Sequence, residues 1–284
     1  MVYHNLVKGL KMAGIPYRLN DFKYIKQNND EIACIIGKDH VLYENNWKSP
    51  IVFGPSFGIN PVADPDILKQ YPIKKLIVPG PWLKEMFSGY GAENVESWPV
   101  GIDTDKWAPG DYEKSCDFLI YNKIMWDHKK MNDQLVEPLK QHLKKNNLTY
   151  TEIKYGFYKP DELKNKLSAC RYAIFLCEHE TQGIAYQQIL SSGLPILAWD
   201  RGGYWQDPNW YPEKIKFQPV SSVPYWDEYC GEKFSSIADF AIKLSKFMDL
   251  NSAGFFQPRA YILKNLTLEK CANDYFDIIS SIKL

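Results

Sequence analysis

The sequence lacks an excess of charge of either sign. Its 284 residues include 34 basic and 34 acidic side chains, which gives a formal net charge of zero at neutral pH. A protein whose main partner is nucleic acid needs a basic excess to neutralise the phosphates. We therefore expect no nucleic-acid partner.

Long apolar runs and paired cysteines are also missing. No window approaches the roughly 20 apolar residues of a membrane-spanning helix, and the first residues lack the apolar core of a secretion signal. None of the six cysteines forms a C-x-x-C pair, and Cys34, Cys116 and Cys177 lie in apolar runs that predict buried thiols. Buried thiols that form no disulfides are typical of the reducing cytosol. We therefore expect a cytoplasmic protein without an integral membrane span.

Aromatic residues, by contrast, are plentiful: they make up 15% of the chain and include nine Trp and nineteen Tyr. Aromatic faces bind sugars, but aromatic side chains also fill hydrophobic cores. The irregular stretch 204–229 is rich in Trp, Tyr and Pro. It predicts either a sugar-binding platform or a satellite hydrophobic cluster beneath a loop.

Short apolar runs alternate with amphipathic segments along the chain. The runs predict buried strands, and the segments with helical periodicity predict helices. The expected strands cover residues 17–19, 32–36, 50–53, 75–78, 95–100, 117–121, 151–155, 172–177 and 194–199. The expected helices cover residues 5–12, 82–90, 132–145, 160–170, 184–190, 234–248 and 268–284. This alternation predicts an α/β protein whose parallel sheets have helices on both faces.

The stretch from Gly101 to Gly110 interrupts the alternation. It contains Pro, Gly and charged residues but shows no periodicity. Such a stretch is typical of a linker between domains. We therefore divide the chain into a first domain at 1–104 and a second domain at 105–267, followed by the helix at 268–284.

The segment from Glu178 to Gly203 carries the clearest functional signal. It follows a buried strand and contains a tight turn, a helix and a second buried strand. Gly183 lies where the turn becomes the helix, and Gly193 and Pro195 end that helix. The first N–H groups of a helix have no partner within it, and its dipole is positive there. This turn therefore predicts a phosphate site.

Five residues of this segment have the spacing of a known motif. Glu180, Gly183, Gln188, Gly193 and Pro195 follow the pattern E-x-x-G, four residues, Glu or a substitute, four residues, then G-x-P. The segment therefore resembles the retaining GT-B glycosyltransferases, in particular the family 4-like proteins of glycosyl transferases group 1. Gln188 departs from the usual Glu, because it can accept a hydrogen bond but carries no charge.

The resemblance implies a fold and an activity. The implied fold is GT-B, with two doubly wound Rossmann-like domains that face each other across a cleft. The first domain would lie on the acceptor side, the second would bind the nucleotide sugar, and the last helix would pack back on the first. The implied reaction of glycan biosynthesis moves a hexose or pentose from a nucleotide-diphosphate donor to a hydroxyl of a glycan or other acceptor. It would proceed with retention of configuration and without a cofactor.

The resemblance also implies which residues of the segment bind the donor. Glu180 would contact the donor sugar and Gln188 the ribose hydroxyls, while the amides of Gly183 and Ile184 would stabilise the phosphate. Two plainer alternatives remain at this stage. Glu180 can be a carboxylate that favours the start of the helix, and Gln188 can be a polar side chain that faces solvent.

Basic residues follow the strand at 117–121. Relatives place an Arg and a Lys there to neutralise the diphosphate, and in this chain Lys123 stands in the Arg position. Together with Asn122 and Lys129 it would complete the donor site. Lysine suits a phosphate as a point charge. A solvated basic loop is the alternative.

Two D-x-D triplets raise the question of a metal ion. Asp64-Pro65-Asp66 and Asp103-Thr104-Asp105 match the metal-binding triplet of another glycosyltransferase fold. Two acids one residue apart are common by chance, and the histidines have no metal-ligand spacing. We therefore predict no metal site and a metal-independent transfer. His179 adjoins Glu180, and we expect it to pack rather than to bind the donor.

Two other functions fit the same features. A sugar-nucleotide epimerase can share the fold, but it needs acid and base groups in the cleft, and we can assign no such pair. A non-catalytic glycan- or nucleotide-binding protein is favoured by Gln188 and by the start of the chain, which lacks the first strand and glycine-rich loop of the family.

Overall fold

The computed structural model describes residues 1–37, 39–56, 60–63, 65–110 and 113–283. The chain forms two compact units. Unit 1 contains Met1–Gly101, Gln206–Phe217 and Leu266–Leu284, and unit 2 contains Ile102–Trp205 and Gln218–Asn265. The expected division at 104/105 lies close to the observed one at Gly101/Ile102. It placed residues 206–217 in the second domain, whereas the structure places them in unit 1.

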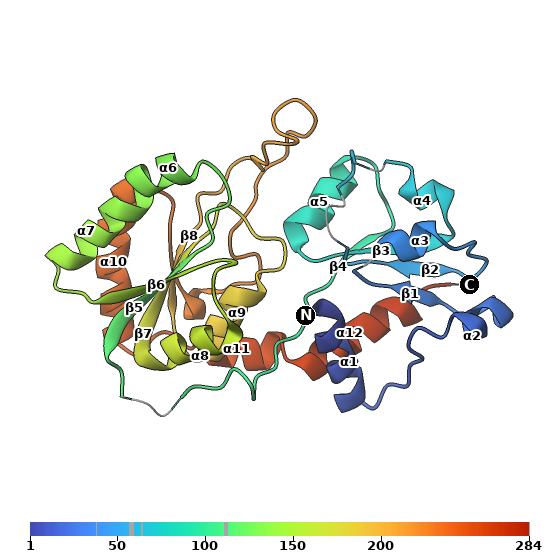
Figure 1. The fold of residues 1–284 in the computed structure, drawn as a ribbon, viewed down its shortest axis with the longest axis horizontal. Coiled ribbons are helices and arrows are strands. Elements are labelled where there is room, and N and C mark those ends of the chain that lie inside the picture. Colours follow the sequence, from blue (N-terminus) through green and yellow to red (C-terminus); the bar gives the residue numbers. More distant parts are fainter. Residues whose placement is uncertain (38, 57–59, 64, 111–112, 284) are drawn as a thin grey trace. The chain divides into compact units, whose positions relative to one another are not determined.

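Unit 1 is built on a four-stranded parallel sheet in the order β1-β2-β3-β4. Helices α1 and α12 lie on one face of this sheet, and α3, α4 and α5 lie on the other (Figure 1). Its elements are α1 (Val2–Met12), α2 (Phe22–Gln27), β1 (Ala33–Ile35), α3 (Asp39–Tyr43), β2 (Ile51–Phe53), α4 (Ile67–Gln70), β3 (Ile73–Val78), α5 (Pro81–Gly89), β4 (Val95–Ser97) and α12 (Leu268–Ser280).

Two expectations for unit 1 are wrong. Residues 17–19 form no strand, and Tyr17 and Leu19 are exposed. The run is too short to form a stable strand without a neighbour to bond, and β1, at the edge of the sheet, pairs with β2 alone. Cys34 is exposed rather than buried, because β1 is an edge strand, although its thiol still contacts the buried Tyr275 side chain of α12.

Helix α12 is held to unit 1 by close packing. Gly9 of α1 lies directly against α12, since a Cβ atom on Gly9 would be 2.3 Å from the Leu268 carbonyl oxygen and 2.9 Å from the Ala272 Cβ. The Trp98 indole donates a hydrogen bond of 2.7 Å to the Cys271 carbonyl. The Trp98 ring also packs against Tyr275, with the centroids 4.8 Å apart.

Unit 2 is built on a five-stranded parallel sheet in the order β6-β5-β7-β8-β9. Its elements are β5 (Cys116–Asn122), α6 (His128–Met131), a π-helical turn (Asn132–Val136), α7 (Glu137–Lys145), β6 (Tyr150–Lys154), α8 (Pro160–Ala169), β7 (Cys170–Leu176), α9 (Ile184–Ser191), β8 (Ile196–Trp199), a 3-10 turn (Glu228–Cys230), β9 (Gly231–Phe234), α10 (Ile237–Ser252) and α11 (Pro258–Asn265). Strand β9 was not predicted, because Gly231–Phe234 contains a single large apolar residue.

Helices cover both faces of the sheet in unit 2. Helices α6, α7 and α10 lie on one face, and α8, α9 and α11 lie on the other (Figure 1). Alternate residues of the central strands therefore enter two cores, which explains why these strands are apolar throughout. The core on the α7 and α10 side consists of Phe118, Ile120, Ile124, Leu135, Val136, Leu139, Leu143, Ile174, Leu176, Leu197, Trp199, Phe234, Phe240, Leu244, Phe247 and Phe256. Two parallel sheets with helices on both faces confirm the predicted α/β, doubly wound class.

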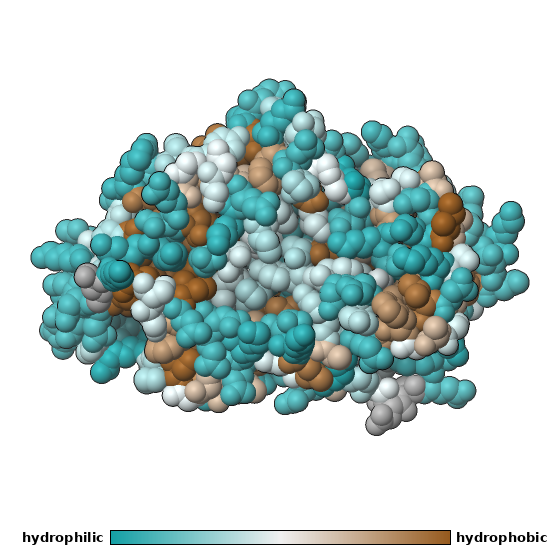
Figure 2. All heavy atoms as spheres, turned by 180° about the vertical axis from the view of Figure 1, so that it is seen from behind, coloured by the Kyte–Doolittle hydropathy of each residue, from teal (hydrophilic) through white to brown (hydrophobic). Residues whose placement is uncertain are grey.

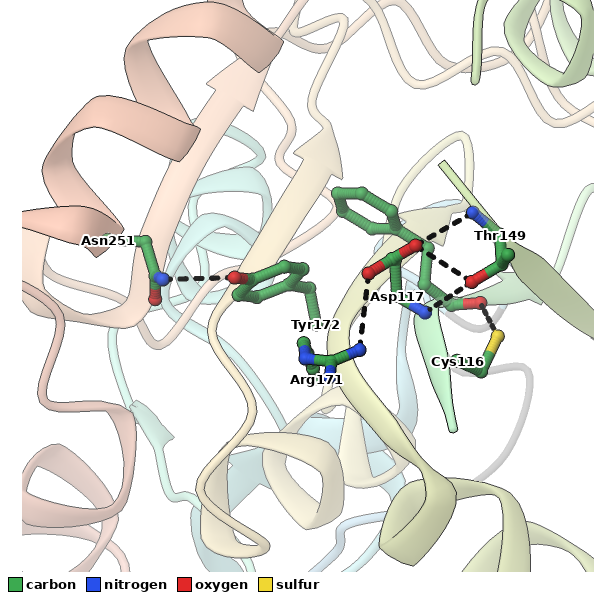
Figure 3. A network of polar contacts seen from close by, with 7 residues as sticks. Cys116, Asp117, Thr149, Arg171, Tyr172 and Asn251 are labelled. Atoms are coloured by element: carbon green, nitrogen blue, oxygen red, sulfur yellow. Dashed lines mark hydrogen bonds and ion pairs between the residues drawn. The ribbon is translucent and has the colours of Figure 1, made fainter. Parts of the chain in front are cut away.

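A polar network fixes the strands at the amino-terminal end of this sheet (Figure 3). The Asp117 carboxylate accepts hydrogen bonds from the Thr149 N–H at 2.8 Å and from the Thr149 hydroxyl at 2.7 Å. It also pairs with Arg171 at 3.3 Å. Beside it, Asn251 donates to the Tyr172 hydroxyl at 3.1 Å. The network joins β5, the turn before β6, β7 and α10, so it fixes the strand register at the end of the sheet opposite the candidate site.

Hydrophilic residues cover most of the face shown in Figure 2, and hydrophobic residues lie in separate patches between them. This pattern is expected when the large apolar side chains are used mainly in the cores. Within the described part of the chain, no helix has the length and apolar character needed to cross a membrane.

The contact between α1 and α12 leads to a stability prediction. Gly9→Ala should lower the free energy of unfolding by about 1–3 kcal/mol, because the added methyl group meets backbone rather than a movable side chain. Gly89→Ala is the matched helical control, since a Cβ there meets no atom within 4 Å. It should leave the stability unchanged or raise it by less than about 1 kcal/mol. Urea unfolding of both variants makes the comparison, and an equal effect of the two changes would contradict this packing.

Candidate functional site

The strand order of unit 2 changes direction between β5 and β7. The chain passes from β5 to β6 on one side and then returns to place β7 on the other side of β5. The loops at the carboxyl ends of β5 and β7 therefore leave the sheet in opposite directions, and open α/β sheets bind ligands in the crevice between such loops. The two strands end together, since Asn122 and Leu176 are register partners.

An ion pair joins these two loops. Lys123 directly follows β5, and its Nζ bonds the Glu180 carboxylate in the loop after β7. The side chains are only 17% and 8% exposed, respectively. The Lys123 Nζ also lies 4.5 Å from the ring centroid of Tyr155, which follows β6. The structure thus brings together two of the predicted site residues, a cation and a carboxylate, at the switch point.

The environment of Lys123 keeps its charge. Burial by itself lowers the pKa of a lysine, but the Glu180 carboxylate, with smaller effects from Cys177 and Tyr155, raises the pKa of Lys123 above its ordinary value. Lys123 is therefore an ammonium ion at neutral pH. A buried charge of this kind is tolerated only because its partner is close.

Glu178 ties the loop after β7 to the loop after β5, a role that sequence reasoning missed. Its carboxylate accepts hydrogen bonds from the Met125 N–H, at 3.1 and 3.0 Å, and from the Trp126 N–H, at 3.2 Å. Glu178 is buried although it is an acid. An acid directly after the apolar run at 172–177, two residues before Glu180, is the signal that could have indicated it.

Gly183 confirms the predicted transition from turn to helix. It is the N-cap residue of α9 in the left-handed region, with φ 72° and ψ 36°. A Cβ atom there would lie 1.9 Å from a ring carbon of Tyr186. That ring cannot move aside, because Tyr186 is fully buried and its hydroxyl bonds both the N–H and the carbonyl of Tyr225. Only glycine fits, and Ile184 then begins the helix with its N–H at the positive end of the dipole.

Gln188 lies in the second turn of α9 and is only 6% exposed, so the solvent-facing alternative is wrong. The helix is buried around most of its circumference, which explains why a polar residue there is not at the surface. Its carboxyl end is held by Gly193, which is left-handed with φ 84° and donates its N–H to the Leu190 carbonyl. This arrangement confirms the predicted end of the helix.

The other two predicted donor-site residues have partners of their own. The Asn122 amide donates to Glu152 at 2.9 Å, and its oxygen accepts from the Ile124 N–H at 3.2 Å. Lys129 lies on α6, where its side chain is 92% exposed and pairs with Asp133 at 2.9 Å. Asn122 therefore shapes the loop that carries Lys123, whereas Lys129 bonds an acid of its own helical segment.

The segment after β8 also contacts Glu180, through its backbone. The Asp200 carboxylate accepts hydrogen bonds from the Ser221 hydroxyl and the Ser222 N–H, both at 2.9 Å. It also pairs with Lys233 at 2.8 Å. The Ser221 carbonyl in turn accepts the Glu180 N–H at 2.9 Å. The backbone of Glu180 is thus fixed by the end of β8 and its side chain by the end of β5.

Neither D-x-D triplet is shown as a metal site. Asp64 lies outside the described residues, and the Asp103 carboxylate accepts the Lys106 N–H at 3.1 Å within a turn. Within the described ranges, no three His, Cys, Asp or Glu side chains are grouped so that they could hold a metal ion.

Comparison with known proteins identifies the fold. No protein-family model matches the chain, and no curated protein matches its sequence. A mutant of S. aureus TarM in complex with Fondaparinux, alpha-GlcNAc-glycerol and UDP matches with a TM-score of 0.62 and 16% identity, covering 91% of this chain and 58% of TarM. AviGT4, a glycosyltransferase involved in Avilamycin A biosynthesis, matches with a TM-score of 0.56 and 11% identity, covering 99% of this chain and 88% of AviGT4.

A third similar structure is described with a different activity. A Listeria monocytogenes protein described as a UDP-N-acetylglucosamine 2-epimerase matches with a TM-score of 0.50 and 10% identity, covering 99% of this chain and 80% of its own. The chain spans less than three-fifths of the length of TarM. Identities this low establish the fold alone, and the two Rossmann-like units confirm the predicted GT-B fold class.

The geometry at Gly183 leads to a second stability prediction. Gly254, at φ 68°, is a matched control, because a Cβ there meets no atom within 4 Å. Gly254→Ala should cost only the left-handed backbone strain, about 1–2 kcal/mol. Gly183→Ala should cost about 1–3 kcal/mol more, because the methyl group also strikes the Tyr186 ring. Denaturant unfolding measures both, and equal losses would show that Tyr186 yields to the methyl group.

Proposed function

We propose that this protein is a glycosyltransferase that moves a sugar from a nucleotide-diphosphate donor to a hydroxyl of a glycan or other acceptor. The observation that carries the proposal is the Lys123–Glu180 pair at the switch point of unit 2. The pair offers a cation for the diphosphate and a carboxylate for the sugar hydroxyls. Two structural neighbours support the same reaction class: AviGT4 is a glycosyltransferase, and the TarM mutant is in complex with UDP.

The demanding step is departure of the nucleoside diphosphate, as negative charge grows on its terminal phosphate. The Lys123 ammonium and the N–H groups of Gly183 and Ile184 at the start of α9 would stabilise that charge. An incoming diphosphate competes with Glu180 for Lys123. Glu180, once released from Lys123, would accept hydrogen bonds from the donor sugar and orient it.

The nucleoside half of the donor would lie toward Gln188. Its amide can both donate to and accept from ribose hydroxyls, without the charge of the usual Glu. Asn122 would act indirectly, because its amide already shapes the loop that carries Lys123. Lys129 would have to exchange Asp133 for the diphosphate in order to contribute.

Retention of configuration and independence of metal ions belong to this proposal. The resemblance of the segment 178–203 supports retention. Metal independence is supported by Lys123 and the amides of α9, which supply the positive charge that a divalent ion supplies in other transferases.

The first test is turnover by the purified protein. A panel of nucleotide sugars with glycan and simple alcohol acceptors, in the presence of a chelator, should give a transfer product whose anomeric configuration matches that of the donor. Proton NMR shows whether the transfer product forms and which anomeric configuration it has. An isomerised donor would indicate the epimerase instead, and binding without turnover would indicate a non-catalytic binding protein. Activity only after a divalent ion is restored would contradict metal independence.

The second test separates the two ends of the ion pair. Lys123→Met should weaken nucleoside diphosphate binding by about 1–3 kcal/mol, the value of a hydrogen bond to a charged group, and leave nucleoside binding almost unchanged. Glu180→Gln should preserve or strengthen nucleoside diphosphate binding, because the competing carboxylate is gone, yet abolish most transfer. Calorimetry and transfer rates measure the two effects.

A double variant controls for folding. Lys123→Met by itself leaves the Glu180 carboxylate buried without its cation, which can cost about 3–5 kcal/mol of stability. Lys123→Met combined with Glu180→Gln removes both charges, so it should recover stability but not nucleoside diphosphate affinity. Equal weakening of nucleoside and nucleoside diphosphate binding in these variants would contradict the assignment of Lys123.

A further inference from the structure

Three consecutive residues in the loop after β7 contact the loops that follow β5 and β8. Glu178 accepts the backbone N–H groups of Met125 and Trp126 after β5. Glu180 bonds Lys123 through its side chain. His179, between the two acids, contacts aromatic side chains from the loops after both β5 and β8.

The geometry of His179 is specific. Its ring stacks on the Trp126 indole, with centroids 5.2 Å apart and an interplanar angle of 28°. The Trp205 indole donates its N–H to the His179 Nε2 at 2.7 Å, and the two rings meet edge to face at 83°. Trp205 is buried and is the last residue of unit 2 before the segment that belongs to unit 1. The hydrogen bond therefore anchors the chain where it leaves unit 2.

This hydrogen bond requires a neutral imidazole. An indole can only donate, so His179 Nε2 must be the acceptor and the ring proton must be on Nδ1. Burial, together with Arg201 from the loop after β8 and Lys123 from the loop after β5, lowers the pKa of His179 to about 3. The neighbouring acids Glu178 and Glu180 do not offset this effect. At any pH well above 3 the acceptor is present.

We propose that His179 is a positioning residue of the transfer site. Its side chain holds the loops after β5 and β8 against the loop after β7 and thereby fixes Glu180. The effect of His179 on transfer rests on the proposed function, whereas the hydrogen bond between Trp205 and His179 is independent of that function. The expectation that His179 packs rather than binds the donor agrees with this role. Neither Trp126 nor Trp205 could be assigned to it from sequence, because they lie far from His179 along the chain.

The hydrogen bond is tested by NMR of the tryptophan indoles. Trp205→Phe removes one indole signal and so identifies it. In the wild type that signal should stay unchanged from about pH 8 to about pH 5, because a neutral acceptor persists. A shift with a midpoint near 6.5, the ordinary pKa of histidine, would overturn the inference. His179→Phe should move the signal upfield and speed its exchange with solvent at every pH.

The positioning effect is tested with three variants. His179→Phe keeps a ring but removes the acceptor, and Trp205→Phe removes the donor. Each should lower kcat by about tenfold, the value of one good hydrogen bond, while the donor KM changes much less. His179→Gln, whose side-chain oxygen can reach the position of Nε2, should stay close to the wild type. Equal loss in His179→Gln and His179→Phe would overturn the role of the acceptor.

Hydrogen exchange separates this inference from the proposed function. Amide exchange in residues 123–127 should be faster in His179→Phe and Trp205→Phe than in the wild type and in His179→Gln. Unchanged exchange in all variants would overturn the positioning role whether or not the protein transfers sugar. If the variants differ in exchange as expected but the wild type transfers no sugar, only the proposed function is overturned.

Discussion

The buried ion pair between Lys123 and Glu180 sets the requirements for the rest of the site. Two charges removed from water are stable only in close and well-oriented contact. The loops that carry them must therefore be fixed to within a fraction of an ångström. The register of β5 and β7 brings the loops together, and Glu178 binds the backbone of the facing loop. The fold supplies this precision through its sheet, since loops alone are mobile.

The positions of the loops at the carboxyl end of the sheet depend on contacts at its amino-terminal end. A slip of one residue between β5 and β7 would move every side chain of the slipped strand from one face of the sheet to the other. Asp117 opposes such a slip by bonding Thr149 and Arg171 at the amino-terminal end. The apolar cores on both faces also oppose a slip, because their side chains pack well in only one register. The candidate site and the contacts that fix the strand register thus lie at opposite ends of the same strands.

The sequence predicts the local part of this arrangement well. Strands, helices and the transition at Gly183 follow from patterns within a few residues, and the structure confirms them. The run at 17–19 shows the limit of such local patterns. A strand needs a neighbouring strand to pair with, and the run itself does not indicate whether one is present. Contacts between distant residues, such as His179 with Trp205, leave no local pattern. Individual roles of Glu180 and Gln188 came from motif spacing and remain predictions.

The membership of α12 in unit 1 has a consequence for how the chain is made. Gly9 and Trp98 contact Leu268 and Cys271, so the contacts that complete unit 1 join its segment Met1–Gly101 to α12. A ribosome releases these partners in order, and all of unit 2 emerges between them. Unit 2 can therefore close its sheet during synthesis, whereas unit 1 keeps an open face until α12 has emerged. Its nascent state exposes apolar surface for that interval, when chaperones have their best access to it.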